Sequence, residues 1–288
     1  MKMKGNPNLL LLPAMIYITV VTFFPEAYAV YISAFRWLFP SPPVYAGLDN
    51  YTALFSSDLF YSSLSNTVFW VAVTYVVETS IALAVALLIQ RDSRLNKFTR
   101  TLLIVPMMIP PVIVSELWAY LFNPVYGPVN YFLHALGAPQ PDWLGHLPEA
   151  WYALIIVDIW QWTPFLILIF LAALYSVPPD LVEAAEVDGA STVSKFRYVT
   201  LPLILPIMFI GGLLRVVDLL RSFENVMLLT RGNPGQGTWL YSFFIFYQGL
   251  AGSLQVGYGA AASIVFLLFT GAIVVTIIML YFRLMARA

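Results

Sequence analysis

Residues 183–202, EAAEVDGASTVSKFRYVTLP, decide the fold, because they form a polar stretch between two long apolar runs, with acidic residues first and basic residues last. The Pro-Pro pair at 178–179 fits the first turn of a helix, where the following acidic side chains meet the positive helix end. Gly189 is expected to end this helix, Ser191 to cap a second short helix, and Pro202 to begin the next apolar helix. The pattern predicts a helix–turn–helix elbow outside a lipid bilayer.

The composition is that of a polytopic membrane protein. Of the 288 residues, 60% are hydrophobic and only 10% are charged, which exceeds what a soluble domain of this size needs to fill one core. The net charge of −1 and the dispersed basic residues give no surface for nucleic acid. Since the chain has no cysteine, disulfides, Cys-ligated zinc and thiol catalysis are excluded.

Six apolar runs are long enough to cross about 30 Å of hydrocarbon, which takes about 20 helical residues. The sequence therefore predicts an all-α polytopic membrane protein with six transmembrane helices, at roughly residues 9–35, 66–90, 101–122, 151–176, 202–222 and 259–282. Three longer loops, at about 37–65, 123–150 and 223–258, fall on one side of the membrane.

The orientation follows from the basic residues on each side. The side that holds both termini has ten: Lys2, Lys4, Arg91, Arg94, Lys97, Arg100, Lys195, Arg197, Arg283 and Arg287. The other side has Arg36 and Arg231. Because cytoplasmic loops carry the excess of Lys and Arg, the N-terminus, the C-terminus and the elbow are predicted to be cytoplasmic.

The first apolar run also resembles a signal peptide, since Ala27 and Ala29 form an A-x-A cleavage site. An uncleaved first helix is preferred, because the run is long and five spans would place the C-terminus on the side with few basic residues. Within the third run, Pro106, Pro110 and Pro111 predict a bend or a break. A broken span that lines a cavity and a static packing kink both fit this pattern.

Polar and aromatic residues gather in the fourth span. Asp158, Gln161 and Trp162 lie at i, i+3 and i+4, with Trp160 beside them, while Glu78 falls near the midplane of the second span. Indole rings beside an amide and a carboxylate suit a polyhydroxylated ligand, whose apolar ring faces stack on aromatic side chains. Hydrogen bonds between helices, with packing by the aromatic rings, explain the same residues.

Three charged residues of the fifth span, Arg215, Asp218 and Arg221, repeat at i+3 and form a ladder of alternating sign. The ladder suits a gate that opens during transport, and it equally suits a neutralised network that locks helices together, which is the favoured interpretation. Glu26 and Glu116 lie in the outer halves of their spans and could pair with it. One sequence does not assign these partners.

Signatures of soluble enzymes are absent. None of the four lysines follows a glycine, so there is no P-loop for ATP. His134 and His146 lie in one outer loop without an H-E-x-x-H pattern, and no metal site is expected. No catalytic residues are predicted.

At residue 183 the sequence resembles the cytoplasmic EAA motif of binding-protein-dependent ABC importer permeases. The matching residues are Glu183, Ala184, Ala185, Gly189, Leu201 and Pro202. A second group, Asp188, Ala190 and Phe196, extends the match toward the carbohydrate branch, the maltose/glycerol-phosphate type. The sequence WQWTPF at 160–165 and the segment with Phe223 and Glu224 also resemble sugar permeases, so the likeness covers most of the chain after Asn66.

The resemblance implies a MetI-like ABC permease fold, with residues 1–288 as a single transmembrane permease domain and residues 178–201 as its cytoplasmic coupling elbow. It also implies a second, homologous permease subunit, two cytoplasmic ATPase subunits and an extracytoplasmic substrate-binding protein as partners. This chain would bind no cofactor, since ATP and Mg lie on the ATPase subunits. The nine matching residues would couple ATP hydrolysis to transport, because a rigid elbow can convert ATPase closure into rocking of a helix bundle.

The candidates for the substrate path are the polar and aromatic residues of the spans and the segment that follows the fifth span, namely Glu78, Asp158, Trp160, Gln161, Trp162, Phe223 and Glu224. A sugar is the expected cargo. Glycerol phosphate, amino acids or polyamines remain open as cargo. Arg215 and Arg221 favour an anionic substrate, whereas Trp160, Trp162 and Gln161 favour a neutral sugar. An ion-coupled secondary transporter would use the buried carboxylates but leaves the elbow unexplained.

Overall fold

The computed structural model describes residues 8–286, which divide into two compact units. The first unit comprises the described part of Met1–Tyr61 together with Phe244–Ile273, and the second comprises Ser62–Phe243 with the described part of Val274–Ala288. Three residues of the basic count, Lys2, Lys4 and Arg287, lie outside the described residues.

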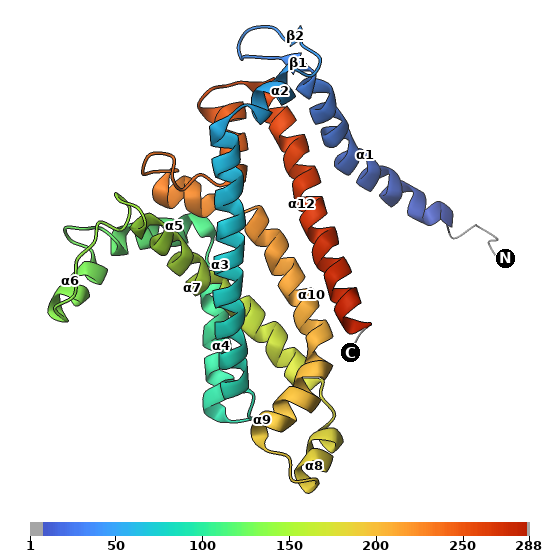
Figure 1. Cartoon of the computed structure of the whole chain (residues 1–288), viewed down its shortest axis with the longest axis vertical. Coiled ribbons are helices and arrows are strands. Elements are labelled where there is room, and N and C mark those ends of the chain that lie inside the picture. Colours follow the sequence, from blue (N-terminus) through green and yellow to red (C-terminus); the bar gives the residue numbers. More distant parts are fainter. Residues whose placement is uncertain (1–7, 287–288) are drawn as a thin grey trace. The chain divides into compact units, whose positions relative to one another are not determined.

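The first unit contains two long helices, one from each of its two chain segments, and a small β-hairpin that follows the first of them (Figure 1). It holds α1 (Asn8–Ser33), β1 (Phe35–Arg36), β2 (Val44–Tyr45), α2 (Asp49–Phe55), the π-helical turn η3 (Tyr247–Ala251) and most of α12 (Val256–Met285). The strands β1 and β2 pair in antiparallel fashion. The Asn50 side chain donates 2.8 Å hydrogen bonds to the carbonyls of Ser33 and Phe35, which ties α2 to the end of α1 and to the hairpin.

The second unit is built around α7 (Glu149–Tyr175), which packs against α4 and α10. Its other elements are most of α3 (Asp58–Ile89), α4 (Arg94–Met108), α5 (Pro111–Leu121), α6 (Pro128–Ala135), α8 (Pro179–Val187), α9 (Thr192–Lys195), η1 (Phe196–Thr200), α10 (Leu201–Leu220), η2 (Val226–Thr230) and the start of α11 (Tyr241–Phe246). Buried apolar side chains of α3, α7 and α10 form its core, among them Ala82, Ala86, Leu166, Phe170 and Ile204.

A small residue brings α10 close to α3. A Cβ at Gly212 would collide with the hydroxyl group of Tyr75, so the two helices approach each other where that side chain is missing. This approach places α10 within reach of polar groups on α3. The long side chain of Arg215 lies one turn further along the helix.

Five described helices are long and apolar enough to cross a membrane, and α4 with α5 makes a sixth span if the pair is counted as one. The predicted break in the third span is confirmed, because the axes of α4 and α5 differ by 95°. Pro110 is the N-cap of α5 and Pro111 its first residue, a position where proline costs no hydrogen bond. In addition, α3 begins at Asp58, earlier than predicted, since an acidic residue suits a helix start and the helix runs beyond its apolar part.

The first half of the elbow has the predicted form (Figure 1). Its helix α8 begins at Pro179, and Gly189 has a φ of +77°, a conformation that side chains with a Cβ disfavour. The Ser191 side chain then caps α9 by accepting a 3.2 Å hydrogen bond from the Ser194 N–H.

The predicted start of an apolar α-helix at Pro202 is confirmed, because α10 begins at Leu201 with Pro202 in its first turn. The sequence did not predict that no break precedes this helix. Residues from Thr192 to Leu220 form one continuous helix of 29 residues. The π-helical turn η1, at Phe196–Thr200, directly precedes the proline. A wider turn accommodates a residue that donates no hydrogen bond to the preceding turn, so α9, η1 and α10 follow one another without a break. The elbow is therefore joined to the fifth span without a hinge at Pro202.

Candidate functional site

One guanidinium group joins three helices in the second unit. Arg215 of α10 donates hydrogen bonds to both carboxylate oxygens of Glu78 on α3, from Nε at 2.8 Å and from Nη2 at 2.9 Å. The same Nη2 pairs with Asp158 on α7. Each side chain is almost completely buried. Because buried charges need partners, Arg215 and the two carboxylates depend on one another.

The alternating ladder predicted along α10 does not form as a continuous row. Arg215 faces carboxylates on other helices, because its position on α10 is buried and a buried guanidinium requires strong acceptors. Asp218 and Arg221 pair with each other at 3.5 Å and are partly exposed. Glu116 is exposed on α5 and forms no ion pair among the described residues, so the structure does not bring it into this cluster. Glu26, on α1 of the first unit, is likewise exposed.

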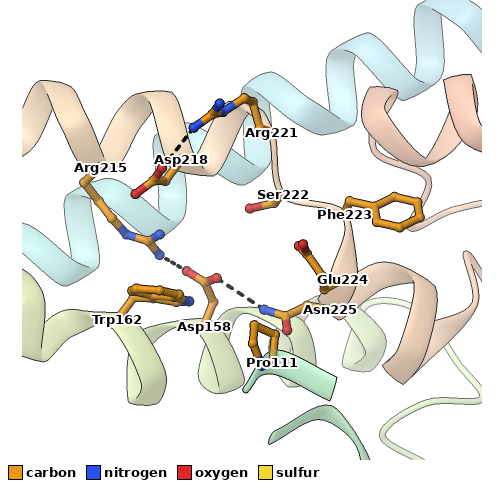
Figure 2. Close-up of a pocket in the computed structure, with 10 residues that line it drawn as sticks. All are labelled: Pro111, Asp158, Trp162, Arg215, Asp218, Arg221, Ser222, Phe223, Glu224 and Asn225. Carbon is orange, nitrogen blue, oxygen red and sulfur yellow. Dashed lines mark hydrogen bonds and ion pairs between the residues drawn. The ribbon is translucent and has the colours of Figure 1, made fainter. Parts of the chain in front are cut away.

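A cavity of about 360 Å³ lies beside this cluster (Figure 2). Side chains of α7 and α10, the segment after α10 and the first residue of α5 line it: Pro111, Asp158, Trp162, Arg215, Asp218, Arg221, Ser222, Phe223, Glu224 and Asn225. The cavity therefore combines carboxylates, guanidinium groups, an amide and aromatic rings. These are the groups that bind hydroxyls and the apolar faces of a sugar ring.

Trp162 and Asp158 both reach the cavity and both contact Arg215 (Figure 2). The Arg215 guanidinium carbon lies 5.7 Å from the centre of the Trp162 ring, within the range of a cation–π contact. Asn225 donates a 3.3 Å hydrogen bond to Asp158 and accepts one of the same length from Ser115 on α5. Asn225 was not singled out from the sequence, although it directly follows the Phe223-Glu224 pair that was.

The other two candidates of the fourth span lie elsewhere. Gln161 donates a 3.0 Å hydrogen bond to the carbonyl of Ile109, at the break between α4 and α5. It thus satisfies a carbonyl that the prolines leave without a helical partner. Trp160 packs edge-to-face against Trp118 and lines a separate, apolar cavity of about 400 Å³ bounded by α3, α4 and α7. The polar and aromatic residues predicted to share one face are therefore divided between three neighbours.

The nine residues of the predicted coupling motif lie in α8, in the turn after it, in η1 and in the first turn of α10 (Figure 1). None of them is buried, and apolar side chains between them, Val187 and Val193, are 89% and 75% exposed. An ion pair between Glu186 and Lys195 joins α8 to α9 across the glycine turn. The elbow is a defined two-helix element whose surface is open to a partner.

Comparison with known proteins identifies this architecture. Residues 78–287 match the model of the family described as binding-protein-dependent transport system inner membrane component. The chain belongs to this family of ABC importer permeases. The matched range includes the elbow, the charged cluster and the whole lining of the cavity.

Individual relatives agree with this assignment. The permease is 34% identical over 259 residues to the trehalose/maltose transport system permease protein MalF of Thermococcus litoralis, covering 89% of this chain and 86% of that protein. It resembles the structure of a bacterial ABC transporter that imports the acidic polysaccharide alginate, with a TM-score of 0.84, 26% identity and coverage of 96% and 94%. A second structure shows a bacterial alginate ABC transporter in complex with an alginate pentasaccharide-bound periplasmic protein. Its TM-score is 0.80 and its sequence identity 25%, and the match covers 95% of this chain and 91% of that chain. The predicted MetI-like, all-α fold is confirmed.

Proposed function

We propose that this chain is the transmembrane permease subunit of an ATP-driven importer whose cargo is a sugar. The observation that carries the proposal is the elbow, in which the EAA motif residues form an exposed helix pair joined to α7 and α10. These two helices also supply most of the charged lining of the cavity. A displacement of the elbow can therefore act directly on the cavity wall.

Within the elbow, each motif residue has a physical role. Glu183 offers a carboxylate for a basic group on an ATPase subunit, and Gly189 provides the positive φ that the turn requires. Ala184, Ala185 and Ala190 allow the partner surface to approach closely. ATP and Mg are held by the two ATPase subunits, so this chain is a translocation subunit that binds no cofactor and carries out no catalysis.

The remaining partners follow from the same assembly. A second, similar permease completes the pathway, and an external binding protein delivers the cargo, as the alginate transporter in complex with its periplasmic protein supports. The excess of basic residues near the termini and the elbow supports their cytoplasmic location, in the inner membrane of a prokaryote.

The charges around the cavity favour a neutral sugar over an anion. Three acidic residues, Asp158, Asp218 and Glu224, and two arginines line it, which gives a formal charge of −1 (2 − 3). The arginine nearest the centre, Arg215, is already engaged by two carboxylates. A glycerol phosphate or another anion would therefore meet little free positive charge, whereas Trp162 offers an aromatic face to a sugar ring.

The same ion pairs weaken the alternative of an ion-coupled secondary transporter. Such a transporter would need Glu78 or Asp158 to exchange a bound cation, but both carboxylates already bind the buried Arg215. It would also have no use for the elbow.

Reconstitution into liposomes tests the proposal. The chain is assembled with its partner permease, the ATPase subunits and the binding protein, and the sugar is chosen by a thermal-shift screen on that binding protein. Uptake should require ATP and all components, and collapse of ion gradients should leave it unchanged. Uptake by the chain alone, abolished by an ionophore, would instead establish the secondary transporter.

A further inference from the structure

Arg100, in the second turn of α4, binds carbonyls at the end of a neighbouring helix. Its Nη2 donates hydrogen bonds to the carbonyls of Ile89, Gln90 and Arg91, at 2.6, 3.2 and 3.1 Å. These carbonyls lie at the C-terminus of α3, where a helix has no internal donors left and carries partial negative charge. One guanidinium nitrogen therefore anchors α4 to the end of α3.

The C-terminus of α7 also contacts the C-terminal end of α3. Tyr175, the last residue of α7, donates a 2.9 Å hydrogen bond from its hydroxyl group to the carbonyl of Gln90. The Arg100 guanidinium carbon lies 5.2 Å from the centre of the Tyr175 ring, so the two side chains also form a cation–π contact. We call this set, made up of Arg100, Tyr175 and the carbonyls of residues 89–91, the Arg100 junction.

The junction lies next to the elbow along the chain. Only residues 176–178 separate Tyr175 from the start of α8. This connection is short and ordered, since the N–H groups of Ser176 and Val177 still donate to carbonyls of the last turn of α7. Because the connection is short and ordered, a displacement of α8 is expected to displace Tyr175 as well.

The far end of α4 leads to the cavity. There, the helix ends at the 95° break, and Pro111, the first residue after it, lines the cavity. The part of α4 that follows Arg100 thus connects the Arg100 junction to the break beside the cavity wall. A rigid helix transmits a displacement along its length, provided that both ends are firmly held.

We propose that Arg100 is a positioning residue that passes the displacement of the elbow from α7 to α3 and α4, and so to the break beside the cavity. The proposal rests on the proposed function, because it requires an elbow driven by ATPase subunits. Arg100 does not touch cargo or nucleotide. Its effect is on the number of cargo molecules moved for each ATP hydrolysed.

The test uses the complete transporter in liposomes and measures uptake and ATP hydrolysis together. Arg100→Met should lower uptake per ATP by about tenfold while ATP hydrolysis stays within about twofold, because the elbow still engages its ATPase but moves α7 alone. Lys97→Met is the matched control, since Lys97 lies on the preceding turn and its exposed side chain forms an ion pair with Asp92 on the surface. An Arg100→Met transporter with the uptake per ATP of the wild type would overturn the proposal.

Two milder variants separate positioning from folding. Arg100→Lys should restore much of the coupling, because a single nitrogen of Arg100 makes all three hydrogen bonds and an ammonium group can replace it. Tyr175→Phe removes only the bond to Gln90 and should lower uptake per ATP by about two- to threefold. If Arg100→Met does not insert, these two variants decide by the same ratio, and wild-type coupling in Tyr175→Phe rejects the junction.

A distance measurement reports the linkage directly. The chain has no cysteine, so spin labels can be placed at Leu95→Cys on α4 and Val187→Cys on α8, both at exposed positions. In the otherwise unchanged chain the distance should be the same with and without ATP, because α4 moves with the elbow. In the Arg100→Met background it should change when ATP binds. Equal behaviour in both backgrounds contradicts the linkage, whereas failure of the wild type to import any sugar contradicts the proposed function instead.

Discussion

Arg215 and Glu78, 137 residues apart in the sequence, form a bidentate ion pair with hydrogen bonds of 2.8 and 2.9 Å inside the helix bundle. Both side chains are buried, with 2% of Arg215 and 0% of Glu78 exposed. A buried pair of this kind adds little stability compared with apolar residues, but breaking it leaves an isolated charge. The pair therefore fixes α10 against α3 in one arrangement.

Arg215→Met should be strongly destabilising, because it leaves the carboxylates of Glu78 and Asp158 buried without a cation. The loss in unfolding free energy should be about 3–5 kcal/mol, measured by thermal or denaturant unfolding of the purified protein in detergent. Arg221→Met is the control, since its pair with Asp218 is exposed and long, and its effect should stay below about 1 kcal/mol. Equal effects of the two variants would show that the buried pair is not required.

Variants of two tryptophans on α7 distinguish a ring that contacts the cargo from a ring that only packs against other helices. Trp162→Ala should lower the uptake rate by about 2- to 10-fold at low cargo concentration, since an aromatic contact contributes about 0.5–1.5 kcal/mol. Assembly with the other subunits should be unchanged. Trp160→Ala is the matched control, because this ring packs against Trp118 and lies outside the cavity. A Trp162→Ala transporter with wild-type kinetics would assign that ring to packing alone.

The features that sequence predicted correctly are those with a local cause. Pro110 and Pro111 are adjacent and remove two consecutive backbone donors, and the third span breaks at this pair, whereas the single Pro164 lies inside α7. Gly189 and Ser191 act within their own turns in the same way. For this reason the break in the third span and the first half of the elbow were predictable from the chain alone.

The features that sequence did not predict depend on tertiary contacts. The i+3 spacing of Arg215 and Asp218 suggested a local ladder, but the close approach of α10 to α3 at Gly212 offered Arg215 a buried partner on another helix. Gln161 turns toward Ile109 because a neighbouring helix is broken there. The spacing of residues along one helix does not determine which neighbouring helix the Arg215 or the Gln161 side chain contacts.

Gly189 should be required for coupling because of its backbone conformation. A β-branched side chain at a φ of +77° is strained, although the surrounding space is empty. Gly189→Val should therefore distort the turn and reduce uptake per ATP, with insertion into the membrane unchanged. Gly189→Asn should retain more activity, since asparagine tolerates this conformation and has a comparable volume. Equal coupling in the two variants, measured in proteoliposomes, would mean that the turn does not control docking.

Gln161 should stabilise the break in the third span. Gln161→Leu removes the hydrogen bond to the Ile109 carbonyl and leaves that acceptor without its side-chain donor, which should cost about 1–3 kcal/mol in unfolding free energy. Thr163→Val is the control on the same helix, because the buried Thr163 hydroxyl has no hydrogen-bond partner among the described residues. Its replacement by a side chain of the same shape should be neutral or slightly stabilising. If Gln161→Leu is as stable as Thr163→Val, the bend does not depend on this hydrogen bond, and Pro110 and Pro111 hold it.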